Sequence, residues 1–188
     1  MKRSTSNRRS AYALTLTLVV LLWGCGQRQE QSTSDGGAPV DAVLLAFLSR
    51  ARSAHHLADG LERDKKFEPA RAVLLELVTG ARPGRLQPEV REVIADTFAR
   101  LADLSSRLGK FDEADRQVKA GLELVPETTY FQGHLWEVRG VVEERRAEAL
   151  RGAGDAQAAQ AAAQRALYAF EKAMNIQAEV IKRALPLP

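Results

Sequence analysis

The sequence predicts an all-α protein whose helices occupy the chain from residue 40 onward. Apolar residues recur there at steps of three and four, which is the period of one face of a helix. Ala, Leu, Glu and Arg dominate its composition and all favour helices. Gly, Pro and polar clusters divide it into segments of helical length. We therefore expect six helices in a domain at residues 40–184, followed by a short tail at 185–188.

The first 24 residues differ from this part and are typical of an export signal. Residues 1–10 carry four basic side chains and no acidic one, namely Lys2, Arg3, Arg8 and Arg9. Residues 11–22 have no charge, and this stretch is shorter than the about 20 residues that a transmembrane helix needs. We expect residues 1–24 to be a signal peptide that is cleaved off.

Leu22, Trp23, Gly24 and Cys25 form a segment that resembles the lipobox of bacterial lipoproteins, although Trp23 is bulkier than that family usually has. The resemblance implies cleavage between Gly24 and Cys25, attachment of acyl chains such as palmitate to Cys25, and anchoring in the cell envelope. Gly26 is not the aspartate that retains some lipoproteins in the inner membrane, so the resemblance favours the outer membrane, facing the periplasm. The alternative is an ordinary secretory signal with a cysteine near the cut.

Residues 25–39 are rich in Gln, Ser and Gly and predict a flexible tether from lipidated Cys25. Cys25 is the only cysteine, so no disulfide can form within the chain. The helical domain must be stabilised by packing alone, and it is long enough to bury a core.

Two helices are predicted between the tether and residue 80. The polar segment 62–66 separates them, and Gly80, Pro83 and Gly84 form the linker that follows. The first has an apolar stripe of Val43, Leu44, Phe47, Leu48, Ala51, Ala54, Leu57, Ala58 and Leu61, and the second has Phe67, Ala70, Val73, Leu74, Leu77 and Val78.

Four more helices are predicted downstream of this linker. Pro88 suits the first turn of the third, whose stripe runs to Leu108, and the fourth extends from Phe111 to Leu124 before Pro126. Thr128 or Thr129 can cap a fifth helix that ends near Gly152. Asp155 can cap a sixth that ends near Ala184.

The segment from Leu108 to Pro126 resembles the second half of a tetratricopeptide repeat. Along this segment the family has a glycine at the turn, an aromatic residue, a small residue, a bulky residue, a second small residue and a closing proline, and all six types are present here. The preceding helix also has the aromatic, the aliphatic and the small residue of the family's first helix. These are Gly109, Phe111, Ala114, Val118, Gly121 and Pro126, and Phe98, Leu101 and Ala102. The resemblance implies a short right-handed solenoid of about three antiparallel helical hairpins.

The flanking hairpins match the family more loosely. Phe67, Ala70 and Leu74 repeat the pattern, but Lys65 replaces the turn glycine, and Phe67 and Phe111 are 44 residues apart where the family has about 34. The last hairpin matches at Trp136, Gly140, Ala166, Phe170 and Ala173, with both helices extended by two turns. The alternative is an unrelated six-helix bundle, which would enclose a single core.

The charges and polar residues point to no catalytic chemistry. Removing residues 1–24 leaves a nearly neutral chain, which gives no reason to expect a nucleic-acid partner. No histidine has the spacing of a zinc site, so we expect the histidines to lie on solvated surfaces. We expect the same of two pairs of acidic residues, because basic residues flank them on predicted helix surfaces. These are His55, His56, His134, Asp112, Glu113, Glu143 and Glu144. No catalytic residue, metal site or cofactor is predicted.

A non-enzymatic role therefore fits best. Lipid-anchored tetratricopeptide-like proteins resemble scaffolds or assembly factors for envelope complexes, in which the first helices of the hairpins grip a segment of a protein partner. The residues that the resemblance places there are Arg50, His55, Arg100, Asp103, Arg107 and Arg139. The alternative is an envelope enzyme or small-molecule-binding subunit with a site between the hairpins, for which residues 143–146 give weak support.

Overall fold

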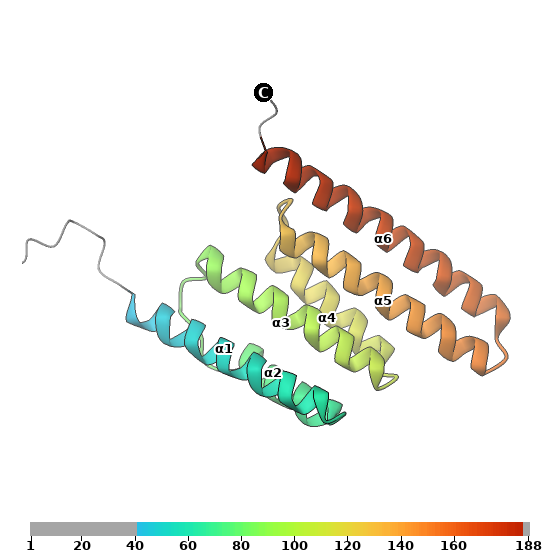
Figure 1. Ribbon diagram of the computed structural model, residues 1–188, viewed down its shortest axis with the longest axis horizontal. Coiled ribbons are helices and arrows are strands. Elements are labelled where there is room, and N and C mark those ends of the chain that lie inside the picture. Colours follow the sequence, from blue (N-terminus) through green and yellow to red (C-terminus); the bar gives the residue numbers. More distant parts are fainter. Residues whose placement is uncertain (1–40, 186–188) are drawn as a thin grey trace, which may run out of the picture. The chain divides into compact units, whose positions relative to one another are not determined.

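The computed structural model describes residues 41–185 and folds them into six helices, with no strand in that range (Figure 1). The helices are α1 (Ala42–Arg63), α2 (Phe67–Thr79), α3 (Pro88–Arg107), α4 (Phe111–Leu124), α5 (Tyr130–Gly152) and α6 (Ala156–Ala184). The all-α prediction is confirmed. The predicted signal peptide at 1–24, Cys25, the tether at 25–39 and the tail beyond residue 185 lie outside the described residues.

Side chains at the helix starts explain where several helices begin. Thr129 accepts a hydrogen bond from the backbone N–H of Gln132 at 3.3 Å, and Asp155 accepts one from Ala158 at 2.9 Å. Asp41, which was not among the predicted caps, accepts from the N–H groups of two residues at the start of α1. Each cap satisfies backbone donors that have no partner within the first turn of a helix.

The turns α1–α2, α3–α4 and α5–α6 share one geometry. In each, one residue has a positive φ, and the N–H of the next residue bonds to the carbonyl five positions earlier, which is the Schellman motif. The φ values are 59° at Lys65, 73° at Gly109 and 83° at Gly154. The bonds run from Lys66 to Leu61 at 2.8 Å, from Lys110 to Ser105 at 2.9 Å and from Asp155 to Leu150 at 3.0 Å.

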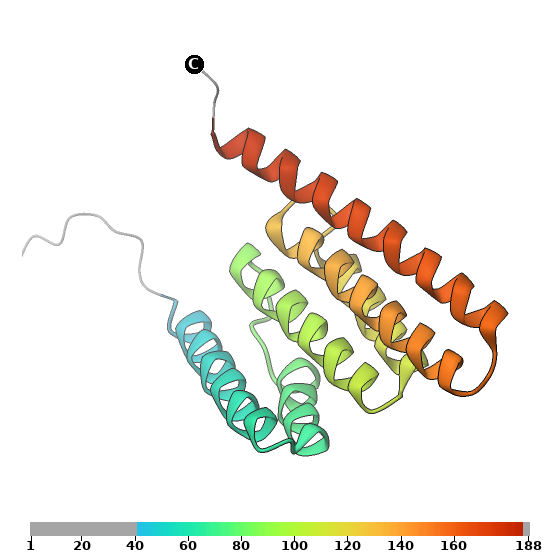
Figure 2. The same cartoon turned by 45° about the vertical axis from the view of Figure 1, so that its right-hand side comes forward.

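Consecutive helices pack in pairs, and the pairs follow one another along the chain (Figures 1 and 2). The helix α3 packs against α1, α2, α4 and α5, and α5 packs against α3, α4 and α6. Within the described residues, α1 and α2 have no Cα within 8 Å of α5 or α6. The α3–α4 pair therefore separates the first pair from the last.

The buried side chains form two apolar clusters rather than one. The first joins α1 and α2 to one face of α3, and its fully buried members include Leu74, Ile94 and Leu101. The second joins the other face of α3 to α4 and α5 through Ala99, Ala114 and Leu135 among others. Each fully buried leucine contributes roughly 1.5–3 kcal/mol relative to an exposed one. The helix α3 is thus the element that holds both clusters together.

Small residues line the contact between α5 and α6. On α6 they are Ala159, Ala162, Ala166, Ala169 and Ala173, and on α5 they are Gly133, Gly140 and Ala147. A Cβ at Gly140 would lie 2.5 Å from Cε1 of Phe170, and one at Gly121 would lie 2.6 Å from Cδ2 of Leu135. Both glycines are therefore required for close approach of a neighbouring helix.

Two residues of the predicted stripe on α1 are exposed to solvent. Val43 is 62% exposed and Leu57 is 55% exposed, whereas Phe47, Ala51 and Ala58 are buried. The reason is that α1 is the outermost first helix, so α2 and α3 cover only part of its circumference. None of the helices in residues 41–185 is both long and apolar enough to cross a bilayer.

Candidate functional site

The first helices of the three pairs, α1, α3 and α5, line a groove that contains two hollows. The first hollow has a volume of about 320 Å³ and is lined by Leu48, Ala51, Arg52, His55, Val93, Asp96 and Phe131. The second has a volume of about 270 Å³ and is lined by Glu62, Ala99, Arg100, Asp103, His134, Glu137, Val138 and Val141. Both combine apolar walls with a few polar groups, as binding sites commonly do.

Arg100 links the two helices that form one wall of this groove. Its Nη2 donates to Asp59 at 2.7 Å and to Glu62 at 2.5 Å, and its Nη1 donates to the carbonyl of His55 at 3.3 Å. All three acceptors belong to α1, whereas Arg100 belongs to α3. A guanidinium with its fixed fork of donors suits this arrangement, which sets the width of the groove between α1 and α3.

His55 is held as a neutral imidazole beside Arg100. The Thr97 hydroxyl donates to the carbonyl of Val93 at 2.7 Å, so it can only accept from Nε2 of His55, 2.9 Å away. The unprotonated Nδ1 then accepts from Arg100 at 3.2 Å. Burial, followed by the charge of Arg100, lowers the pKa of His55 below its ordinary value of 6.5.

Asp96 lies between two histidines on the floor of the groove. One carboxylate oxygen is 3.8 Å from Nδ1 of His55 on α1, and the other is 3.9 Å from Nε2 of His134 on α5. His134 also lies 3.4 Å from Glu137, and the ring of Tyr130 stacks on it. This polar row crosses all three helices, so a ligand that spans the groove would pass over it.

The structure brings together three of the six predicted partner-binding residues. His55 lines the first hollow, and Arg100 and Asp103 line the second. Asp103 also accepts hydrogen bonds from Arg107 at 2.8 Å and from Arg145 at 2.7 Å. Arg107 therefore lies next to the groove without lining either hollow, and its guanidinium covers the ring of Phe67.

Arg50 and Arg139 lie elsewhere. Arg50 donates to the carbonyls of Glu76 and Ala81 at 3.4 and 3.3 Å and so fixes the end of α2. Arg139 lies over the ring of Trp136, 4.9 Å from its centroid, and lines a hollow that α4, α5 and α6 share. Neither side chain faces the groove.

Several groove residues were not predicted to bind a partner. They are Glu62, Asp96, His134, Glu137 and Val141. The expectation that the histidines lie on solvated surfaces is wrong for His55 and His134, whose side chains are 19% and 26% exposed, and correct for His56. The three- and four-residue steps His134, Glu137 and Val141 were the available signal, because such steps place residues on one face of a helix.

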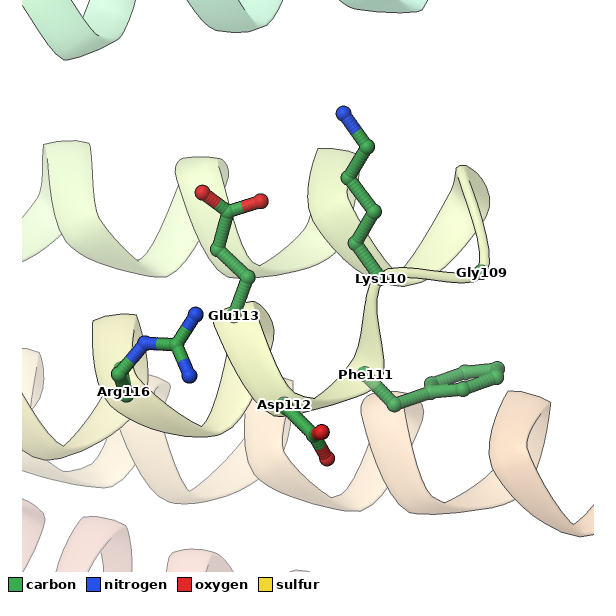
Figure 3. Close-up of a pocket in the computed structure, with 6 residues that line it drawn as sticks. All are labelled: Gly109, Lys110, Phe111, Asp112, Glu113 and Arg116. Atoms are coloured by element: carbon green, nitrogen blue, oxygen red, sulfur yellow. The ribbon is translucent and has the colours of Figure 1, made fainter.

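A larger hollow of about 400 Å³ lies at the turn between α3 and α4 (Figure 3). All six lining residues belong to the segment 109–116, so no second element encloses it. Lys110 and Glu113 project to one side of this segment, where they pair with Glu68 and Arg71 of α2. These residues connect neighbouring helices and do not form a site.

The hollow between α4, α5 and α6 has a volume of about 410 Å³ and is lined by Glu143 and Arg146, two of the four residues at 143–146 that weakly favoured an enzyme. Glu143 is buried there, contrary to the expectation of a solvated pair with the exposed Glu144. Its carboxylate accepts from Arg165 at 2.9 Å and lies 3.8 Å from Arg146. The bond to Glu143 raises the pKa of Arg165, so this carboxylate is part of an ion-paired link between α5 and α6.

No group of three or more His, Asp or Glu side chains that could hold a metal ion occurs in the part of the chain that the structure describes. Comparisons of the chain with protein-family models, with curated proteins and with solved structures find no match.

Proposed function

We propose that this chain is a lipid-anchored lipoprotein of the bacterial cell envelope whose helical domain is a protein-interaction scaffold or assembly factor. The anchor would be Cys25, which follows a basic and then apolar leader and the lipobox-like segment 22–25. A diacyl or triacyl cysteine would hold the protein on a membrane stably, because two acyl chains suffice. The tether at 25–39 would separate the membrane from the helices.

In this proposal the domain is a short tetratricopeptide-like solenoid with an extended last hairpin. Three features support it. The three turns share one geometry, α3 connects two apolar clusters instead of facing a single core, and the small residues Gly121 and Gly140 permit close helix approach. The lengths of α5 and α6, 23 and 29 residues, fit an extended hairpin.

The proposal that the domain binds a partner rests on the groove, because α1, α3 and α5 contribute side chains to a common concavity with two hollows. We propose that it binds an extended or helical segment of an envelope protein, with apolar anchors in the hollows and polar contacts to the row around Asp96. The fixed Arg100 link would reduce the ordering cost of binding. Glu143 does not support the alternative of an enzyme, because its carboxylate is already paired with two arginines.

The anchoring part is tested on the full chain expressed in a bacterial host. Mass spectrometry of the membrane-extracted protein should find Cys25 as the first residue, with acyl chains attached. The Cys25→Ala variant should leave the membrane fraction. An unmodified amino terminus, or a Cys25→Ala protein that stays on the membrane, would refute anchoring through Cys25. Neither result would bear on the proposed role of the groove.

The scaffold part is tested by affinity capture from envelope extracts with the full chain. Glu137→Arg changes an exposed residue of the second hollow, and Glu123→Arg makes the same change on α4, which lines neither hollow. We expect one protein to be enriched by the wild type and by Glu123→Arg, and reduced about tenfold with Glu137→Arg. Equal capture by all three would contradict a role for the groove.

A further inference from the structure

The outer side of α6 carries an apolar stripe that is separate from the groove. Leu167, Met174 and Ile181 follow one another at seven-residue steps, and Leu185 comes four residues after Ile181. Their exposed fractions are 71%, 70%, 58% and 64%. We call these residues, with the exposed Ala178, the α6 stripe. The opposite side of α6 packs on α5 through its alanines, so the stripe is free.

This pattern is that of a helix that packs against another helix. Steps of seven and four residues place side chains along one seam, as in a coiled coil. The outermost helix of a helical array normally presents a polar face to solvent, and a contiguous exposed apolar patch marks an interaction site. The chain contains no helix after α6 in the described residues that could cover it.

The charges beside the stripe favour a second copy of this chain in antiparallel orientation. If Met174 of one copy lies beside Ala178 of the other, Leu167 lies opposite Leu185. The same register places Glu171 opposite Ile181 and one residue from Lys182, on the same side of the seam, and twofold symmetry produces this Glu171–Lys182 pair twice. A parallel pair in register would instead bring the two Glu171 side chains together, which costs free energy because like charges repel. The charges beside the stripe therefore favour the antiparallel orientation.

We propose that two copies of the protein associate through antiparallel packing of their α6 helices. From Leu167 to Leu185 the seam covers 19 residues, or 18 steps along the chain, which is about 27 Å of helix. A contact of this length belongs to the small class of interfaces, so the association is reversible and depends on concentration. The groove between α1, α3 and α5 contributes no residue to the pairing, so it stays accessible in the dimer.

The test uses two differently tagged full chains expressed together. The wild-type copies should purify with each other after mild detergent extraction. Met174→Glu in both copies should reduce their co-purification at least tenfold, because it places charges in the seam. Ala161→Glu is the matched control, since Ala161 is exposed on α6 outside the stripe, and it should have no effect.

A charge exchange tests the antiparallel register without adding a new charged position to the stripe. Glu171→Lys alone and Lys182→Glu alone should each reduce co-purification several-fold, and the two changes combined in one chain should restore it. Both residues are exposed, so folding is preserved. Wild-type copies that do not co-purify, insensitivity to Met174→Glu, or a combined variant no better than the single ones would overturn the proposal.

Discussion

Gly140 of α5 lies directly against the ring of Phe170 of α6: a Cβ added at Gly140 would come within 2.5 Å of Cε1 and 2.6 Å of Cδ1 of that ring. The phenyl ring therefore occupies the space that any other residue at position 140 would need. This contact fixes how closely the last two helices approach each other.

We expect Gly140→Ala to destabilise the protein by about 2 kcal/mol, because the added methyl group overpacks a closed interface. Urea unfolding followed by circular dichroism measures the change. The control is Gly152→Ala, at the end of the same helix, where a Cβ would meet nothing within 4 Å. That change should be neutral or stabilise by up to about 1 kcal/mol. Equal effects of the two substitutions would show that the contact is not closed.

Lys65 occupies the turn position that glycine occupies in the other two turns, with a φ of 59°. Lys65→Gly should stabilise the protein by about 0.5 kcal/mol, since relief from a left-handed conformation exceeds the entropy cost of glycine. Lys65→Ala, which removes the side chain and keeps the strain, is the control. Gly109→Ala and Gly154→Ala should each cost about 1 kcal/mol. A Lys65→Gly protein less stable than Lys65→Ala would contradict the shared turn geometry.

The lowered pKa of His55 predicts that acid weakens the fold. In the unfolded chain this imidazole takes up its proton near its ordinary pKa of 6.5, whereas in the folded protein burial and Arg100 keep it neutral to lower pH. The unfolded state therefore binds more protons in this window, and stability falls as the pH drops through 6.5 toward the lower folded pKa.

Thermal unfolding between pH 7.5 and 5 should show this loss. In His55→Gln the dependence on pH should be shallower, because glutamine does not titrate but can still donate to Thr97. His56→Gln should keep the wild-type dependence, since the His56 side chain is 70% exposed. Identical slopes for the wild type and His55→Gln would contradict the assignment of this effect to His55.

Arg100 should be the most important polar residue for the shape of the groove. Arg100→Met removes its bonds to Asp59 and Glu62 and leaves two neighbouring carboxylates without their cation. We expect a loss of about 1–2 kcal/mol, discounted for its partial exposure. Arg52→Met, at an exposed position of the first hollow, should change stability by less than about 0.5 kcal/mol. Denaturant midpoints compare the two variants.

The helices could be predicted from the sequence because their ends carry local signals. Pro88, Thr129 and Asp155 begin helices, and Gly109 and Gly154 adopt the positive φ that ends them. Such signals act within a few residues of the chain. They require no knowledge of which helices become neighbours.

The composition of the groove could be predicted only in part, because it depends on how each helix is rotated about its axis. Arg139 lies two residues from Glu137 and two from Val141, both of which line the second hollow. Two residues correspond to a rotation of about 200°, so Arg139 must face the opposite side. Arg50 likewise lies two residues from Leu48 and two from Arg52, both of which line the first hollow, so it also faces the opposite side of its helix. Periodicity identifies the faces of a helix but not which face meets the groove.

The most direct test of the scaffold role is site-specific photo-crosslinking in living cells with the full chain. A photoreactive amino acid replaces Arg52 or Glu137, which are exposed at the two hollows, or Ala161, which is exposed on α6. We expect both groove positions to crosslink to the same envelope protein, and Ala161 not to do so. Crosslinks to that protein from all three positions, or from neither groove position, would contradict the assignment of partner binding to the groove.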